Sequence, residues 1–250
     1  MSETSCAALV KKADPDRFLS VMAAPPAARA PLFAIYAFNV EVSRAPWMTQ
    51  EAMIAEMRLQ WWRDVLDEIA EGKAARAHEV AEPLARVLDA QGAEILDRLV
   101  VARRWDIYRD PFEDEAHLHA YLQDTSGGLM WVAARALGLR SEEAAVRDIG
   151  FALGVANWLR AVPALEAQGR IPLVDGRPEA VAALARLGLS RLNARVGDGR
   201  GYPALRAAWQ AGPILRLAAR HPERVAQGRL GLSEFKRKGL LVMKSTLGRY

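Results

Sequence analysis

Apolar residues recur every three or four positions along almost the whole chain, with charged and polar residues between them. This period places the apolar side chains on one face of an α-helix, whereas a half-buried strand would require strict alternation. We find no stretch in which apolar and polar residues alternate between hairpin turns. The pattern therefore predicts an all-α protein.

Proline, glycine, aspartate and serine mark most boundaries of the predicted helices. The first helix should begin at Asp14 and Pro15, because aspartate caps a helix well and proline suits its first turn. Further helices are predicted over residues 27–45, 49–70, 79–90, 93–108, 113–137, 141–165, 178–196, 202–220 and 233–247. Residues 166–177 are the longest predicted loop, and such loops often cover a pocket.

Two adjacent tryptophans, Trp61 and Trp62, lie in the helix predicted over residues 49–70. Neighbouring side chains on a helix point about 100° apart, so both cannot face the same part of the core. Trp62 continues the apolar stripe of its helix. Trp61 then lies either between two helices or on an exposed contact surface, and we favour the first.

The composition is that of a folded protein, with 250 residues, of which 51% are hydrophobic and 26% charged. We expect one domain over residues 1–250. Cys6 is the only cysteine, which excludes an intramolecular disulfide and favours a reducing compartment. Neither a signal-peptide-like segment nor an 18-residue apolar run is present, so we expect a cytoplasmic protein, with peripheral attachment to the inner face of a membrane as the alternative.

A net charge of +4 is compatible with an anionic partner, but arginines are spread over nearly every predicted helix. A solvated arginine-rich surface is the simpler interpretation, and we expect no nucleic-acid partner. The clearest local concentration of positive charge lies in the predicted basic C-terminal helix, residues 233–250. It combines a basic cluster with an apolar run: Lys236, Arg237, Lys238 and Lys244 beside Leu240, Leu241, Val242 and Met243.

This C-terminal segment has two interpretations. It can bind an anionic membrane surface, because basic residues add electrostatic attraction to the insertion of apolar side chains. Alternatively, it is a terminal helix that docks on the bundle and leaves a basic face in solvent. The membrane interpretation predicts that the segment contributes little to the core.

Four segments between residues 14 and 175 share an order and spacing with one enzyme family. They are Pro25-Pro26 with Arg29 and the run Ala34 to Phe38; Leu59 to Asp64; Arg104 to Tyr108 with the Leu118 to Tyr121 stretch and Ser126-Gly127-Gly128; and Asn157 to Arg160 ahead of Gly169 to Pro172. Taken together they resemble the squalene/phytoene synthases, which join two prenyl diphosphates head to head.

The resemblance implies an isoprenoid-synthase-type helical bundle around a central cavity. In that family two aspartate-rich helices face each other and hold magnesium ions that bind a diphosphate. Mg²⁺ prefers oxygen ligands, and carboxylates four residues apart lie on the same side of a helix. The metal neutralises the charge that develops on the departing diphosphate.

Neither aspartate-rich motif of the family is acidic in this chain. The resemblance places the first motif at Ser43, Arg44 and Trp47, and the second at Ala161 and Leu165. We therefore expect no metal site, no cofactor and no catalytic residue at these positions.

The nearest acidic residues are Glu41 and Glu166, each about one position out of register, which rotates a helical side chain by about 100°. A working Mg²⁺-dependent prenyltransferase with relocated ligands is the alternative. It requires Glu41 with Glu166, or Asp64 with Asp67, to converge on the cavity.

The chain is most similar to the non-catalytic branch of the family that contains complex I assembly factors. That similarity implies a protein that binds a protein client or an isoprenoid-like lipid instead of catalysing a reaction. Placing the family's facing helices on this sequence gives candidate cavity residues, with the two arginines near the mouth: Phe33, Tyr36, Phe38, Arg44, Met130, Val155, Asn157 and Arg160.

Overall fold

Helices make up the regular structure of residues 2–247, which are the residues that the computed structural model describes, and no strand occurs among them. The all-α prediction is confirmed. The α-helices are α1 (Ser2–Ala13), α2 (Pro15–Met22), α3 (Pro26–Arg44), α4 (Ala52–Ala70), α5 (Ala81–Ala85), α6 (Ala90–Ala102), α7 (Glu115–Leu122), α8 (Gly128–Ala136), α9 (Glu143–Ala167), α10 (Pro178–Leu192), α11 (Tyr202–Leu205), α12 (Ala211–Arg220), α13 (Glu223–Ala226) and α14 (Glu234–Thr246).

Short turns of other helix types join several of these helices. Four are 3-10 turns: η1 (Ala45–Trp47), η2 (Arg103–Asp106), η4 (Gly199–Gly201) and η5 (Arg206–Ala208). The fifth, η3 (Gln123–Gly127), is a π-helical turn between α7 and α8. π-Helical turns are rare and often occur at functional sites.

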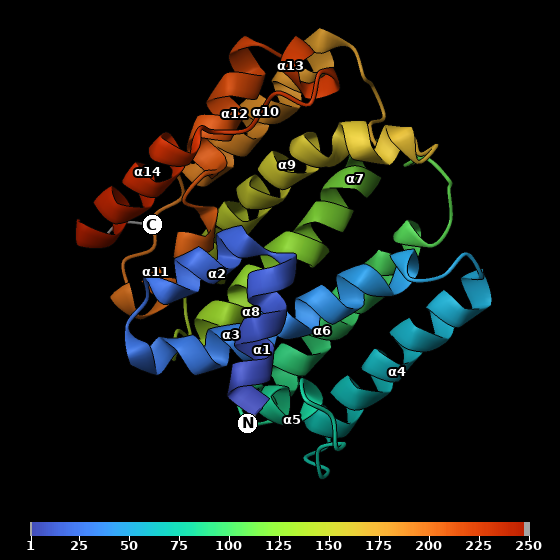
Figure 1. Cartoon of the computed structure of the whole chain (residues 1–250), viewed down its shortest axis with the longest axis vertical. Coiled ribbons are helices and arrows are strands. Elements are labelled where there is room, and N and C mark those ends of the chain that lie inside the picture. The colour runs from blue at the N-terminus through green and yellow to red at the C-terminus, as the bar shows by residue number, and fades with distance from the viewer. Residues whose placement is uncertain (1, 248–250) are drawn as a thin grey trace.

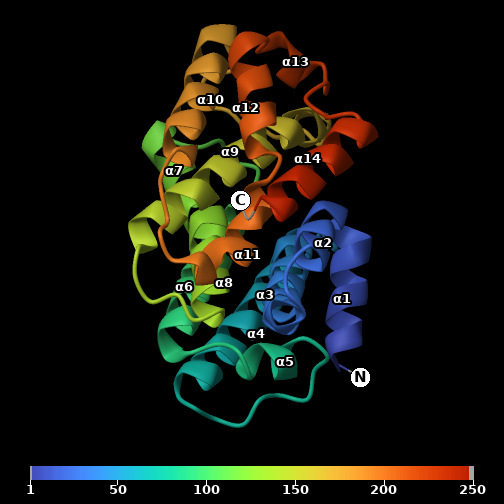
Figure 2. The same ribbon diagram turned by 90° about the vertical axis from the view of Figure 1, so that its left-hand side faces the viewer.

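The longest helix, α9, lies in the middle of the bundle (Figure 1). It packs against α8 and η3 on one side and against α10 and α12 on the other, while α8 also contacts α3 and α6. The outer helices α1 and α4 cover α3 and α6 (Figures 1 and 2). This arrangement gives α3, α8 and α9 the most buried positions.

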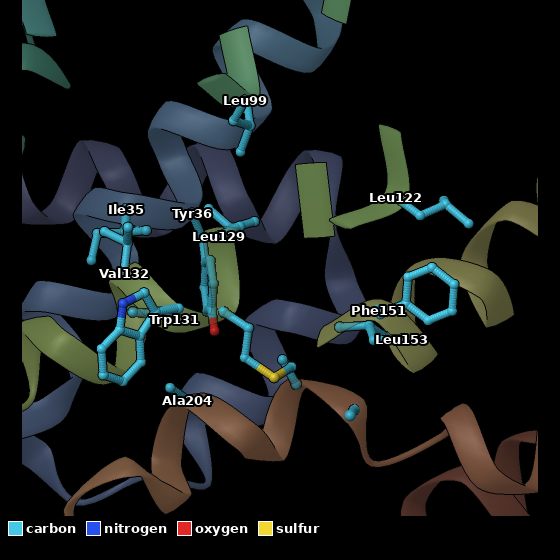
Figure 3. Close-up of a cluster of buried hydrophobic side chains, with 14 of the residues drawn as sticks. Ile35, Tyr36, Leu99, Leu122, Leu129, Trp131, Val132, Phe151, Leu153 and Ala204 are labelled. Atoms are coloured by element: carbon cyan, nitrogen blue, oxygen red, sulfur yellow. The ribbon is translucent and has the colours of Figure 1, made fainter. Parts of the chain in front are cut away.

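The core forms around α3, α8 and α9, whose apolar residues are not confined to one stripe. Tyr36 of α3 and Trp131 of α8 are almost completely buried, and Figure 3 shows them among Ile35, Leu129 and Val132. Burial removes the phenol of Tyr36 from water and raises its pKa to about 12. A helix that is apolar on most sides is expected in such a central position.

The N-terminal segment differs from the sequence-based expectation. The first helix was predicted to begin at Asp14, but α1 already spans Ser2–Ala13. Cys6 and Val10, one turn apart, are buried, and the Cys6 thiol lies 3.5 Å from the carbonyl oxygen of Glu79. Only these two side chains of α1 are fully buried among those described, so its apolar period is too short to stand out in the sequence.

Two of the long predicted helices are divided. Residues 113–137 form α7, η3 and α8, because the helix widens into a π-turn before the glycine pair 127–128. Residues 202–220 form α11, η5 and α12, and Pro213 lies in the first turn of α12, where a missing amide hydrogen is tolerated. Over residues 2–247, no helix combines the length and the apolar character needed to cross a bilayer.

Candidate functional site

The two segments that the resemblance equates with metal-binding motifs lie around one cavity of about 280 Å³. Ser43 of α3 and Trp47 of η1 form part of its wall, and Ala161 and Leu165 of α9 form another part. Each pair is separated by four residues, which is the spacing that puts two side chains on one side of a helix. All four of these side chains are uncharged.

Polar side chains also line this cavity. Asn39 of α3 is only 7% exposed, and its side-chain oxygen has no hydrogen-bond partner. Asn157 of α9 and Ser126 of η3 also reach the cavity. A buried amide oxygen without a partner is costly, so it favours a bound water or ligand at this point.

Arg17 reaches the cavity because of the cap that the sequence predicts at Asp14. The Asp14 carboxylate accepts a hydrogen bond of 2.9 Å from the backbone N–H of Arg17, and it also pairs with the Arg17 guanidinium at 3.2 Å. The guanidinium lies over the ring of Tyr36, 5.1 Å from its centre. The helix cap and the ring therefore fix this cation at the cavity wall.

A buried ion pair forms the side of the cavity next to α7. The Arg103 guanidinium lies 3.0 Å from the Asp106 carboxylate and donates a hydrogen bond of 2.7 Å to the hydroxyl of Tyr121. That hydroxyl donates in turn to Asp106 at 3.1 Å. Among the described residues of the cavity wall, Asp106 carries the only carboxylate, and this network already neutralises its charge.

The same network shifts the pKa values of Arg103 and Tyr121. Burial acts to lower the pKa of Arg103, but Tyr121 and Asp106 outweigh it through their charges and hydrogen bonds, so the net shift is upward. Burial raises the pKa of Tyr121, and Asp106 adds to this effect against the opposing Arg103. At neutral pH the network is therefore a charged arginine, a neutral phenol and the Asp106 side chain between them.

The loop predicted over residues 166–177 is attached beside the cavity. Arg170 is buried and donates hydrogen bonds to the backbone carbonyls of Trp105, Asp106 and Tyr108. Its guanidinium also lies over the ring of Trp47, 4.8 Å from the centre. Pro172 accepts a hydrogen bond of 2.9 Å from the indole of Trp158, which itself lines the cavity.

The structure places the other candidate cavity residues as follows. Five of them belong to the packed core and do not lie on the cavity wall: Phe33, Tyr36, Phe38, Met130 and Val155. Phe33 packs against Phe18 of α2, and Phe38 packs against Trp62 of α4, so these rings fill the spaces between α3 and its neighbours. Asn157 is the candidate from this set that does line the cavity.

The two arginines expected at the mouth are not part of this wall. Arg44 is exposed at the end of α3. Arg160 lies 3.4 Å from Asp16 and lines a neighbouring pocket of about 260 Å³, which shares Arg17 and Asn157 with the cavity. Each arginine lies one position, about 100° of rotation, away from a motif position that lines the cavity.

The acidic pairs that the enzyme alternative requires are also not brought together. Glu41 lines a different pocket, beside Trp61 and His78, whereas Glu166 is exposed. Asp64 accepts a hydrogen bond from Gln60 on the outer side of α4, and Asp67 is exposed. Over the described part of the chain, no group of three or more His, Cys, Asp or Glu residues could hold a metal ion.

Several residues of the cavity wall were not among the cavity residues expected from the sequence: Arg17, Asn39, Arg103, Asp106, Tyr121 and Trp158. Asn39 carried a recognisable signal, since it is the one amide within the apolar run of α3. Asp106, Tyr121 and Trp158 lie in segments that carry the family resemblance, which was their signal. Arg17 and Arg103 are of a type that also occurs on ordinary helix surfaces, and their contacts depend on how the helices pack.

An all-α bundle whose central cavity joins the ends of α3 and α9 has the architecture of isoprenoid synthases. The family model for squalene/phytoene synthase matches residues 10–243, and the chain belongs to this family. A crystal structure of a dehydrosqualene synthase with a ligand superposes with a TM-score of 0.76 at 16% identity, over 100% of this chain and 97% of the other. The crystal structure of the squalene synthase HpnC from Alicyclobacillus acidocaldarius superposes with a TM-score of 0.62 at 18% identity, over 99% of this chain and 94% of the other.

The curated relatives point to a different branch of the family. The Drosophila melanogaster homolog of NADH dehydrogenase (ubiquinone) complex I, assembly factor 6, is 35% identical over 170 residues, which are 63% of this chain and 50% of the relative. The chain spans about half the length of the curated relatives it matches. The two solved structures, at their low identities, support the fold alone.

Proposed function

We propose that this protein is a non-catalytic, assembly-factor-like member of the squalene/phytoene synthase family that acts by binding. The observation that carries this proposal is the wall of the cavity. Where the family's catalytic members are expected to hold magnesium, the described side chains are Ser43, Trp47, Ala161 and Leu165. The nearest carboxylate, Asp106, is paired with Arg103.

These residues do not fit a magnesium cluster. Mg²⁺ needs oxygen ligands in near-octahedral geometry, usually with more than one carboxylate when several ions share a diphosphate. The four motif positions offer a single hydroxyl, from Ser43. Two of the charged groups that do reach the cavity, Arg17 and Arg103, would repel a divalent cation.

Purified protein is therefore expected to release no diphosphate from farnesyl or geranylgeranyl diphosphate in the presence of Mg²⁺. Without carboxylates to hold the metal, the leaving group is not neutralised and the allylic cation does not form. A phosphate assay coupled to pyrophosphatase measures the release. The controls are a heat-treated sample and an active squalene synthase assayed in parallel.

Turnover well above the heat-treated control would overthrow the non-catalytic proposal. Product analysis would then distinguish head-to-head condensation from simple hydrolysis. In that event, Asp106 and Glu41 would be the first carboxylates to replace, since each lines a pocket near α3.

The size of the cavity favours a protein client over a long lipid as the main partner. Its volume of about 280 Å³ is just below the range of about 300–1,000 Å³ for small-molecule pockets. An exposed apolar surface near the start of α4 supports the same choice. We call it the methionine surface: Trp47, Met48, Met53, Ile54 and Met57.

The methionine surface is suited to a protein partner. Met53 and Met57 are one helical turn apart and are 75% and 66% exposed, while Met48 contacts the Arg58 guanidinium. Flexible methionine side chains adapt to apolar partners, and clustered exposed apolar groups mark interaction sites. From the relatives' names, the client that we propose is an NADH dehydrogenase assembly intermediate.

Replacing Met53 and Met57 with glutamate should reduce co-purification with NADH dehydrogenase subunits about tenfold, because the substitution buries two charges at the interface. The tagged chain is recovered from membranes of its own organism, and the subunits are quantified by mass spectrometry. Val174→Glu, at an exposed apolar residue outside this surface, is the matched control. Equal recovery with the double variant would contradict the role of the methionine surface.

A further inference from the structure

One side of α14 is attached to the rest of the bundle. Arg237 forms an ion pair of 2.9 Å with Asp16, which lies in the first turn of α2. One turn further along, Leu241 is buried, and after another turn the hydroxyl of Ser245 lies 3.4 Å from the carbonyl oxygen of Ala23. Figures 1 and 2 show α14 on the outside of the molecule beside α2.

The docking interpretation of the C-terminal segment is therefore correct for this side of α14. Leu241 is the one buried residue of α14, at 9% exposure, and it lies outside the hydrophobic core cluster, in keeping with the expectation that the segment contributes little to the core. The predicted helix over residues 233–250 is observed as far as Thr246, and residues 248–250 lie outside the described residues.

The opposite side of α14 is apolar and faces solvent. We call it the outer face and define it by Phe235, Gly239, Val242, Met243 and Thr246. Phe235 is 88% exposed and Val242, two turns later, is 62% exposed. A Cβ atom added to Gly239 would meet nothing within 4 Å, so no other part of the described chain covers the centre of this face.

Lysines flank the outer face on both sides. With steps of about 100° per residue, Lys236 lies on one edge of the apolar stripe and Lys238 on the other. Both are exposed, and the contact of Lys238 with Glu234 is long, at 3.6 Å. The charge of Arg237, in contrast, is directed inward and compensated by Asp16 and Glu234.

We infer that the outer face of α14 binds the surface of an anionic lipid bilayer. Phe235, Val242 and Met243 would enter the boundary between headgroups and acyl chains, and Lys236 and Lys238 would lie at the level of the lipid phosphates. Because α14 is already folded and held by Arg237 and Leu241, binding requires no ordering of the helix.

The shape and charge of this face favour a bilayer over a protein. A single helix on the outside of a bundle is convex and presents a narrow apolar stripe, whereas a partner helix is usually bound in a groove. Both flanking charges are positive, which complements a sheet of phosphates and would repel a second copy of the same face. This inference does not depend on the proposed function, since it concerns neither the cavity nor the methionine surface.

The test is co-sedimentation of the full chain with phosphatidylcholine vesicles that contain or lack phosphatidylglycerol. The intact protein should bind the anionic vesicles at low ionic strength and dissociate as salt is added. Phe235→Ala should lower the partition coefficient for anionic vesicles about tenfold, since it removes most of the apolar surface that inserts into the bilayer. Lys236→Glu with Lys238→Glu should abolish the preference for anionic vesicles.

Matched controls keep the test decisive. Val101→Ala removes an apolar side chain from α6 that is 40% exposed and lies outside both proposed surfaces, and it should leave vesicle binding unchanged. None of the substituted side chains on the outer face is buried, so all variants should keep the circular-dichroism spectrum and Tm of the intact protein. Their unfolding would show that the outer face is structural and would overturn the inference.

Two further outcomes would also overturn it. Equal binding to vesicles with and without phosphatidylglycerol would show that the flanking lysines do not recognise the net negative charge of the bilayer surface. Absence of binding to anionic vesicles, combined with a dimer in solution that Phe235→Ala dissociates, would assign the outer face to contact between two copies of the chain.

Discussion

Replacing Asp106 with alanine is expected to lower the free energy of unfolding by about 3–5 kcal/mol. The substitution removes the carboxylate that compensates Arg103, whose side chain is 19% exposed, and it leaves the Tyr121 hydroxyl without its acceptor. A buried charge without its partner costs far more than the ion pair itself contributes. Urea unfolding followed by circular dichroism measures the change.

Two comparison variants distinguish loss of charge compensation from loss of packing. Replacing both Arg103 and Asp106 with leucine removes the uncompensated charge, so the double variant should be more stable than Asp106→Ala. Tyr121→Phe keeps the ion pair and should lower the free energy of unfolding by only about 1–3 kcal/mol. If Asp106→Ala costs less than about 1 kcal/mol, the pair behaves like an exposed surface ion pair and our description of the cavity wall is wrong.

The overall fold could be predicted from the sequence because it depends on local patterns. The three-to-four-residue period of apolar side chains gives the helices, and the cap at Asp14 and Pro15 is found where it was expected. The four-residue spacing also explains why Ser43 and Trp47, like Ala161 and Leu165, line the same cavity, since the spacing within a helix fixes which side chains share a face.

The details of the cavity could not be predicted, because they depend on contacts between distant segments. Arg103 and Tyr121 are 18 positions apart, and Arg170 is 62 positions from Tyr108, so neither contact follows a helical spacing. Aromatic residues such as Phe38 were expected on the cavity wall, but the helices pack closely enough to bury them completely. The π-turn η3 likewise leaves no periodic signal in the apolar pattern.

The close approach of α9 to η3 supports the last prediction, which concerns Gly150. A Cβ atom at this position would lie 2.8 Å from the Cα atom of Gly127 and 2.8 Å from the carbonyl oxygen of Ser126. Both are backbone atoms, so neither can rotate away. Gly154, one turn later, meets the Ser126 side chain in the same way and lines the cavity. These two glycines therefore set the distance between α9 and the π-turn.

Gly150→Ala is expected to lower the free energy of unfolding by about 2–3 kcal/mol, because the clash displaces η3 and outweighs the gain of about 1 kcal/mol in helix propensity. Gly239→Ala is the matched control: it also lies inside a helix, but nothing is within 4 Å of its added Cβ, so it should stabilise the protein by up to about 1 kcal/mol. Thermal and urea unfolding of both variants provide the comparison. A Gly150→Ala protein as stable as the original would mean that α9 and η3 are further apart than described. It would also mean that the contact between Gly150 and η3 does not position Ser126 in the cavity.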